Sequence, residues 1–394
     1  MALTEKGKSA LGHIKTHFPT GAFTAKDLSD AAGEKIVAAT LNAVANNGYL
    51  NKLGGSPVQF EAVADLLDLL ENMETPTAIG LDNTKMATAK RAKNDEFYTR
   101  YEDIEAEVMK YRKQFRGKTV YLPCDDPAEK KSEFWSFFVN NFDAFGLKKL
   151  IATHYDENGK AYKIWIDGDT TGDGYIDDAD ALQEDLIGNG DFRSPECIDI
   201  LNECDIVCTN PPFSLFREFF DVIMQANKLF LIICPQNAFK YKDIFPYIKE
   251  GKVWAGYSFN KTFDFIMSDD YVLTKTGYID DQGRKHGKVA STCWMTNMIV
   301  NKRTEEMILT KKYNSSDYPY FDNYNAINVG RVENIPCDYD GIMGVPISFL
   351  GKHNPNQFEI IGEANHGSDN QYDLFKPIVN GKELFPRILI RRKK

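Results

Sequence analysis

Apolar positions in the first 70 residues follow a helical spacing. Three stretches, at residues 8–18, 25–33 and 34–50, place apolar side chains three and four positions apart, and strand-like segments around a Gly-Gly turn follow them. Three helices and a hairpin are typical of a winged helix-turn-helix, so we predict such a domain over residues 1–70, with Thr24 as N-cap of its second helix. This domain could dock on DNA or contact another protein. The third helix carries few Arg or Lys side chains, which weakens the first alternative.

A different pattern of apolar positions begins after residue 93. Residues 71–93 have little periodicity and are predicted to be a linker. Over residues 94–309, short apolar runs alternate with amphipathic helical stretches, which predicts an α/β domain whose parallel βαβ units form one sheet with helices on both faces. Residues 310–394 are irregular, with strand-like segments at 357–362 and 387–392, and are predicted to be an appended region that presents recognition loops.

Composition limits the class of protein. The chain has 394 residues, of which 43% are hydrophobic and 26% charged, as in ordinary globular proteins. Its net charge of -10 argues against a protein that coats nucleic acid without specificity, although residues 85–93 and the C-terminal tail are locally basic. The seven cysteines form no Cys-x-x-Cys pair, which argues against a zinc site. No apolar stretch reaches the roughly 20 residues that span a bilayer, and the N-terminus lacks a signal-peptide core, so we expect a cytoplasmic protein without membrane association.

The strongest chemical motif follows the apolar run at residues 205–208. Asn210, Pro211, Pro212 and Phe213 stand between this predicted strand and an amphipathic helix. Pro211 has no N–H and precedes another proline, so its backbone carbonyl is a pure acceptor held in one direction. The Asn210 side-chain oxygen is a second acceptor, and Phe213 supplies a flat apolar face. Two acceptors beside an aromatic ring suit the amino group of a flat heterocycle, which predicts methylation of that amine; a plain strand-to-helix turn is the alternative.

A second motif, at residues 169–180, has the spacing of an EF-hand-type calcium loop. Its oxygen donors are predicted at Asp169, Thr171, Asp173, the Tyr175 carbonyl and Asp180, with a glycine at the sixth position and a possible exiting helix behind it. A strand rather than a helix precedes the loop. We therefore expect either a structural calcium ion or a solvated acidic turn.

Five segments, in the same order along the chain, resemble the EcoRI-type adenine-N6 DNA methyltransferases, which use S-adenosylmethionine. They are residues 94–108, 118–127, 188–201, 205–219 and 337–362. The resemblance implies a Rossmann-like S-adenosylmethionine-dependent methyltransferase sheet over residues 94–309, with residues 310–394 as the target-recognition region. The winged-helix-like segment is not part of the family pattern.

The resemblance also implies roles for individual residues. Asn210, Pro211, Pro212 and Phe213 would bind an adenine flipped out of double-stranded DNA, with Asn210 also bordering the cofactor. Phe97, Tyr98 and Thr99 would line the methionine side of S-adenosylmethionine, and Asp191 with Phe192 would hold its adenine moiety. Asp125 would lie near the loop after the first strand and is also assigned to the cofactor.

These observations predict a site-specific DNA methyltransferase that transfers a methyl group to N6 of a flipped-out adenine. Methylation of a glutamine amide in protein or of a base in RNA is an alternative, because the same four-residue motif serves those substrates. A DNA-binding regulator that senses the cofactor without turnover is another. A cognate restriction endonuclease is a possible partner that the activity would not require.

Overall fold

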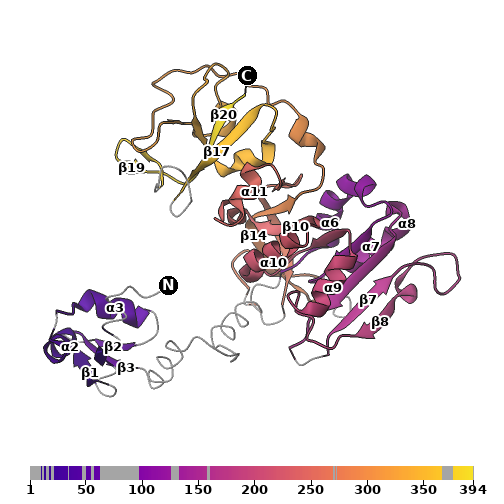
Figure 1. Cartoon of the computed structure of the whole chain (residues 1–394), viewed down its shortest axis with the longest axis horizontal. Coiled ribbons are helices and arrows are strands. Elements are labelled where there is room, and N and C mark those ends of the chain that lie inside the picture. Colours follow the sequence, from indigo (N-terminus) through magenta and orange to yellow (C-terminus); the bar gives the residue numbers. More distant parts are fainter. Residues whose placement is uncertain are drawn as a thin grey trace. The chain divides into compact units, whose positions relative to one another are not determined.

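The computed structural model divides into two compact units, Met1–Asp82 and Asn83–Lys394 (Figure 1). It describes residues 22–33, 35–46, 50–54 and 57–62 with a few positions before them, and then residues 97–125, 133–157, 160–268, 271, 273–365 and 376–393. The predicted linker at residues 71–93 lies outside the described residues.

The first unit combines helices with a small antiparallel sheet of order β1-β3-β2. Its elements are β1 (Ala22–Thr24), α2 (Ala25–Ala32), α3 (Ala38–Asn46), β2 (Leu50–Gly54) and β3 (Gln59–Ala62). Thr24 is the N-cap of α2 as predicted: its hydroxyl accepts from the Asp27 backbone N–H at 3.3 Å, and its own N–H donates to the Asp27 carboxylate at 2.8 Å. The helix α3 is shorter than predicted, and most of the first predicted helix lies outside the described residues.

The second unit is a mixed α/β structure around a large sheet of order β4-β12-β14-β10-β9-β5-β6-β7-β8. The strands are β4 (Phe97–Tyr98), β5 (Thr119–Leu122), β6 (Lys149–His154), β7 (Tyr162–Ile166), β8 (Leu182–Asp185), β9 (Ile206–Thr209), β10 (Leu229–Pro235), β11 (Trp254–Ala255), β12 (Lys261–Met267), β13 (Tyr278–Ile279) and β14 (Lys285–Thr296). Strands β6, β5, β9 and β10 are parallel, whereas β7, β8, β14, β12 and β4 join by antiparallel pairing. The parallel pairing predicted for the four central strands is therefore confirmed, and the outer strands, whose direction was not predicted, extend the sheet by antiparallel pairing. Residues 155–161 between β6 and β7 are too few for the crossover that parallel pairing requires.

Helices cover both faces of this sheet, as predicted. The helices are α6 (Tyr101–Val108), α7 (Phe134–Asn140), α8 (Phe142–Phe145), α9 (Pro195–Glu203), α10 (Phe216–Gln225) and α11 (Phe245–Lys249), with 3-10 turns η1 (Met109–Gln114), η2 (Asp178–Asp180), η3 (Phe213–Leu215), η4 (Gln236–Lys240) and η5 (Asn301–Thr304). Alternate side chains of β5 point to opposite faces: Val120 packs in a core cluster with α6, α7 and α8, and Tyr121 in a cluster with α9 and α10.

The C-terminal residues form a second sheet of order β15-β16-β20-β17. Its elements are β15 (Ile327–Asn328), η6 (Val332–Asn334), β16 (Met343–Val345), η7 (Ile347–Lys352), β17 (Phe358–Ala364) and β20 (Arg387–Arg392), with a separate hairpin of β18 (Ile378–Val379) and β19 (Lys382–Glu383). The strands predicted at 357–362 and 387–392 are confirmed. Phe358 and Ile390 share one core cluster with Ile248 of α11, so this sheet packs directly against the part of the unit that is built on the large sheet.

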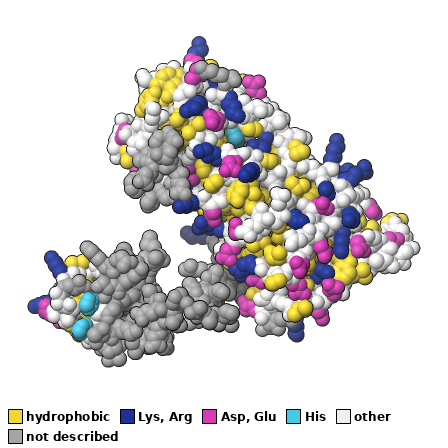
Figure 2. Space-filling view, in the orientation of Figure 1, with side chains coloured by type: hydrophobic (Ala, Val, Ile, Leu, Met, Phe, Trp, Pro, Cys, Tyr) yellow, Lys and Arg dark blue, Asp and Glu magenta, His cyan; other side chains and the backbone are white. Residues whose placement is uncertain are grey.

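The surface seen in Figure 2 carries Lys and Arg interspersed with Asp and Glu, rather than one basic field. This agrees with the net charge of -10. None of the helices in the described part of the chain has the length and apolar character needed to cross a membrane.

Candidate active site

Asn210 stands at the carboxyl edge of the sheet, directly after the buried central strand β9. Pro211 is buried, and Pro212 has extended backbone angles (φ -54°, ψ 126°) before η3 and α10 begin. In the parallel pairing of β5 with β9, Tyr121 lies opposite Val207, so Cys124 and Asp125 follow the end of the neighbouring strand. The motif therefore has the strand-to-helix setting that its chemistry requires, at the edge where such sheets bind ligands.

The Asn210 side chain has a defined orientation. Its Nδ2 donates a hydrogen bond to the backbone carbonyl of Phe97, whereas its Oδ1 is buried and has no hydrogen-bond partner among the described residues. A buried acceptor without a partner costs about 1–3 kcal/mol. Because the amide nitrogen is engaged, the side chain presents an acceptor rather than a donor to a ligand.

Aromatic rings form a wall beside this acceptor. The Phe213 ring meets the Phe97 ring edge-on with centroids 5.3 Å apart, and Phe97 stacks on Phe265 at 5.4 Å. The antiparallel pairing of β4 with β12 brings these residues together, with Met267 opposite Phe97. Sequence reasoning missed Phe265; its only local signal is the alternation Phe-Asp-Phe in a strand.

The other predicted cofactor residues gather at the same edge. Thr99 is buried, and its Oγ1 has no hydrogen-bond partner within the described ranges. Asp125 is buried and accepts from the Trp135 backbone N–H at 2.7 Å, at the start of α7. Burial and the negative charges of Asp125 and Asp191 raise the pKa of the Cys124 thiol, so both carboxylates lie near the end of β5.

Asp191 and Phe192 lie in the loop before α9. The Asp191 carboxylate accepts from Arg193 through Nε at 2.9 Å and Nη2 at 2.6 Å, and the same guanidinium contacts Glu218. The Phe192 ring packs edge-on against Phe219 at 5.1 Å. An apolar slot beside the end of β5 is lined by Tyr121, Pro123, Phe192, Leu201, Val207, Phe219, Val222 and Ile223.

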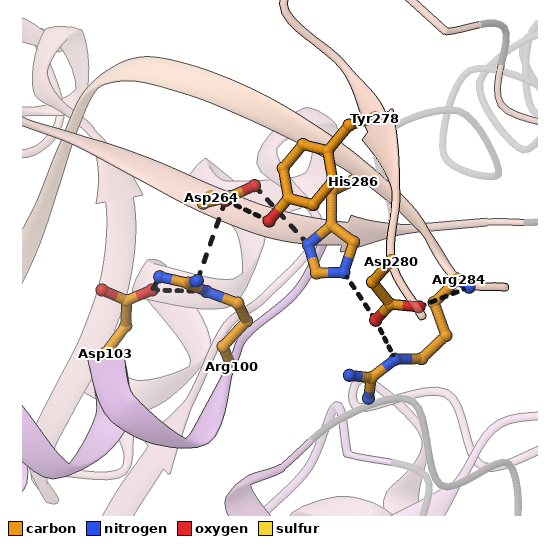
Figure 3. A network of polar contacts seen from close by, with 7 residues as sticks. All are labelled: Arg100, Asp103, Asp264, Tyr278, Asp280, Arg284 and His286. Carbon is orange, nitrogen blue, oxygen red and sulfur yellow. Dashed lines mark hydrogen bonds and ion pairs between the residues drawn. The ribbon is translucent and has the colours of Figure 1, made fainter. Parts of the chain in front are cut away.

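A polar network ties the segment after Thr99 to the ribbon formed by β12, β13 and β14 (Figure 3). Arg100 contacts Asp103 at 3.0 Å and Asp264 at 3.7 Å, and the Tyr278 hydroxyl donates to Asp264 at 2.7 Å. The buried His286 ring lies between the two acids of the ribbon, with Nε2 3.0 Å from Asp280 and Nδ1 3.6 Å from Asp264. The network thereby holds the Phe97–Thr99 segment against the ribbon.

The same network borders a cleft of about 230 Å³ that is lined by Arg100, Tyr101, Glu102, Glu133, Ile266, Tyr278, Asp280, Arg284 and His286. Although burial works in the opposite direction, hydrogen bonds from His286 and Arg284 hold the pKa of Asp280 well below its usual range. Cations and carboxylates thus neutralise one another along the cleft. Sequence reasoning missed this network; the contact that joins its two halves, between Arg100 and Asp264, spans more than 150 positions of the chain.

The calcium prediction for residues 169–180 is not supported. Its carboxylates accept hydrogen bonds from the loop itself: Asp169 from the Gly174 N–H at 2.8 Å, Asp173 from the Tyr175 N–H at 2.9 Å, and Asp180 from the Thr170 and Thr171 N–H groups at 2.7 and 3.0 Å. Tyr175 is exposed, and the expected exiting helix is the strand β8. In the part of the chain that the structure describes, no group of three or more His, Cys, Asp or Glu side chains converges as a metal site.

Comparisons with known proteins agree with this arrangement. Residues 85–393 match the family model described as adenine-specific methyltransferase EcoRI. The type II methyltransferase M.EcoRI of Escherichia coli is 43% identical over 327 residues, covering 79% of this chain and 97% of the relative. The type II methyltransferase M.MgeORF184P of Mycoplasma genitalium is 39% identical, covering 77% of this chain and 97% of the relative.

A third relative, the type II methyltransferase M.MpnI of Mycoplasma pneumoniae, is 39% identical over 278 residues and covers 69% of this chain. Each alignment covers most of the relative, and the family model spans residues 85–393, so the likeness extends far beyond the four-residue motif. No solved structure matches the chain.

Proposed function

Because the chain belongs to the EcoRI-type family of adenine-specific methyltransferases and is a site-specific DNA methyltransferase, we propose that Asn210, Pro211 and Phe213 hold its target adenine during methyl transfer. The observation that carries this proposal is the Asn210 side chain, whose amide nitrogen is bound to Phe97 while its buried oxygen has no partner among the described residues. An exocyclic amine is the donor that such an oxygen lacks.

The adenine reaches this acceptor by leaving the DNA duplex, because atoms buried at the sheet edge cannot touch a stacked base. Asn210 Oδ1 and the Pro211 carbonyl then accept the two N6 hydrogens. Both hydrogen bonds favour a tetrahedral nitrogen whose lone pair is free for attack on the methyl group. Phe213 presents the face of its ring to the base, while Pro212 holds the backbone that aims the Pro211 carbonyl.

S-adenosylmethionine, when bound, supplies an electrophilic methyl group on a sulfonium. We assign Phe97, Tyr98 and Thr99 to its methionine side and Asp191 and Phe192 to its adenine side. The buried Thr99 Oγ1, which has no hydrogen-bond partner among the described residues, supports the first of these assignments. We also assign Asp125 and Asn210, which follow the neighbouring strands β5 and β9, to the cofactor site. Calcium has no part in the proposal, since methyl transfer from a sulfonium requires no metal.

We assign residues 310–394 to recognition of double-stranded DNA, because their sheet packs against α11, which follows the carboxyl end of β10. We assign residues 1–70 to a winged-helix-like arm. Its support is the order of the described elements, in which α2 and α3 precede the hairpin of β2 and β3.

Product analysis tests the proposal. The chain is incubated with methyl-labelled S-adenosylmethionine and plasmid DNA, and the DNA is digested to nucleosides. We expect the label in N6-methyl-2′-deoxyadenosine. Label in cytosine alone, or transfer to RNA or protein without transfer to DNA, would overturn it.

A further inference from the structure

The cleft of about 230 Å³ beside Arg100 has no part in the proposed binding of adenine. Its walls come from the start of α6, from Glu133 at the start of α7 and from the ribbon formed by β12, β13 and β14. Basic and acidic side chains line it together. Pockets that enclose a whole small ligand generally measure about 300 Å³ or more, so this cleft suits a charged part of a larger ligand.

Contacts connect this cleft to the active edge. The Glu133 backbone N–H donates to the carbonyl of Thr99 at 3.3 Å. Thr99 directly follows β4, in which the Phe97 carbonyl accepts from the Asn210 side chain. Glu133 therefore lies beside the segment that we assign to the methionine side of S-adenosylmethionine.

Two side chains of opposite charge meet only loosely in the cleft. Arg284 Nη1 lies 3.7 Å from Glu133 Oε1, which is too long for a hydrogen bond. The Arg284 guanidinium is anchored through Nε, which donates to Asp280 at 2.7 Å, and its two terminal nitrogens point away from Asp280 (Figure 3). Within the described residues, neither these nitrogens nor the Glu133 carboxylate makes a hydrogen bond. An anchored cation and a neighbouring anion are thus both open to a ligand.

The surroundings of the Glu133 carboxylate disfavour its charge. Burial raises the pKa of Glu133; the charge of Arg284 opposes this change, and that of Glu102 adds to it. A partly buried carboxylate with a second carboxylate nearby is stabilised by a cation that hydrogen-bonds to it. An ammonium group has the charge and the donors for this contact.

We propose that Glu133 binds the α-ammonium group of S-adenosylmethionine and that Arg284 binds its carboxylate. The amino-acid end of the cofactor carries both charges on one carbon, so it can enter between the two loosely paired side chains and give each a hydrogen-bonded partner. The inference rests on the proposed function, because it takes Phe97, Tyr98 and Thr99 as the methionine side of the cofactor site. It extends that site into the cleft.

The test measures binding by calorimetry, without turnover. Three ligands are compared: S-adenosylhomocysteine, its analogue without the α-amino group, and 5′-methylthioadenosine, which lacks the whole amino-acid end. Because hydrogen bonds between charged groups are the strong ones, Glu133→Gln should weaken binding of S-adenosylhomocysteine about 10- to 100-fold. The variant should bind the other two ligands as the unmodified chain does, since neither carries the ammonium group.

Arg284→Met tests the carboxylate separately. It should weaken binding of S-adenosylhomocysteine and of the deaminated analogue, both of which keep the carboxylate, and leave 5′-methylthioadenosine unaffected. Glu105→Gln is the matched control, because Glu105 is an exposed carboxylate of α6 that does not line the cleft. It should leave all three dissociation constants unchanged.

Equal weakening of all three ligands by Glu133→Gln, as a merely structural role would produce, or no weakening of any, would refute the proposal. So would an unmodified chain that binds 5′-methylthioadenosine as tightly as S-adenosylhomocysteine. Thermal melting reports any loss of folding in the variants. Failure of the proposed function would look different, because product analysis would then find no label in adenine, whichever ligands bind.

Discussion

Short motifs predict a binding site in two regions of this chain, the sheet edge around Asn210 and the acidic loop at residues 169–180. Both offer oxygen acceptors at a characteristic spacing. At the sheet edge, the fold engages the Asn210 nitrogen and leaves the buried oxygen without a partner among the described residues. In the loop, the Asp169 and Asp180 carboxylates are occupied by backbone N–H groups of the loop itself.

The difference teaches that a motif indicates a site only where the fold leaves its acceptors unsatisfied. A local loop satisfies its own polar groups because neighbouring N–H groups are always within reach. The buried end of a strand offers few such donors, since its N–H groups are already committed to the sheet. The following predictions test that distinction.

The largest effect is expected for Asn210→Ala. The change removes the acceptor for the target amine, so kcat should fall about 100- to 1,000-fold, as when one electrostatic contact to the transition state is deleted. Single-turnover kinetics measures this, and calorimetry should show binding of S-adenosylmethionine unchanged. Asn237→Ala, at an exposed position in η4, is the control and should retain full activity. Normal turnover by the Asn210 variant would contradict the assigned role.

Phe213→Ala should have the next largest effect. The stacking of one base on an aromatic ring is worth about 1–3 kcal/mol, so kcat/KM for DNA should fall about 10- to 100-fold. Phe213→Tyr keeps the flat ring and should restore most of the activity. If Tyr and Ala variants were equally impaired, stacking would not be the function of this ring.

In the loop at residues 169–180, protonation of Asp180 should break the hydrogen bonds that its carboxylate accepts from the backbone of the loop, and should release no bound ligand. Backbone hydrogen bonds from Asp177 and Thr171 lower the pKa of Asp180 to about 2. Because this pKa is below the ordinary value of 3.8, its stabilising effect is complete above that value and is lost as the pH falls toward 2. An NMR titration of the Thr170 and Thr171 amides should therefore show a midpoint near 2. A midpoint at the ordinary value would show that these hydrogen bonds do not form.

The smallest effect is expected for calcium itself. Millimolar calcium, or its removal with a chelator, should leave the melting temperature and the methylation rate unchanged, because the loop carboxylates already have backbone partners. Differential scanning calorimetry with and without calcium measures this. A rise in melting temperature with calcium, if it is lost in Asp169→Ala, would instead support a calcium site in this loop.

Local patterns predicted the elements better than their pairing. Thr24 is the N-cap of α2 as expected, because both partners of its capping box, Thr24 and Asp27, lie within four residues of sequence. The segment after the acidic loop is the strand β8 rather than a helix, because it completes an antiparallel pair with β7, with Glu184 opposite Lys163. Pairing of this kind overrides the helical preference of a short polar stretch.

The active edge shows the same division. Asn210, Pro211 and Phe213 could be proposed from the sequence because adjacent residues carry their chemistry. Phe265 and the contact of Arg100 with Asp264 could not, because each depends on a partner far along the chain, as when β12 brings Phe265 onto Phe97.

The sequence by itself determined the strand-turn-helix that carries the Asn-Pro-Pro-Phe motif, the alternation that makes an α/β unit, and the family to which the chain belongs. Proline geometry, apolar periodicity and side-chain chemistry are local properties, so they can be read directly from neighbouring residues. Only the tertiary structure decided that the Asn210 oxygen lacks a partner among the described residues while the loop carboxylates have theirs. Whether a polar group is satisfied depends on every atom packed around it, and most of those atoms come from elsewhere in the chain.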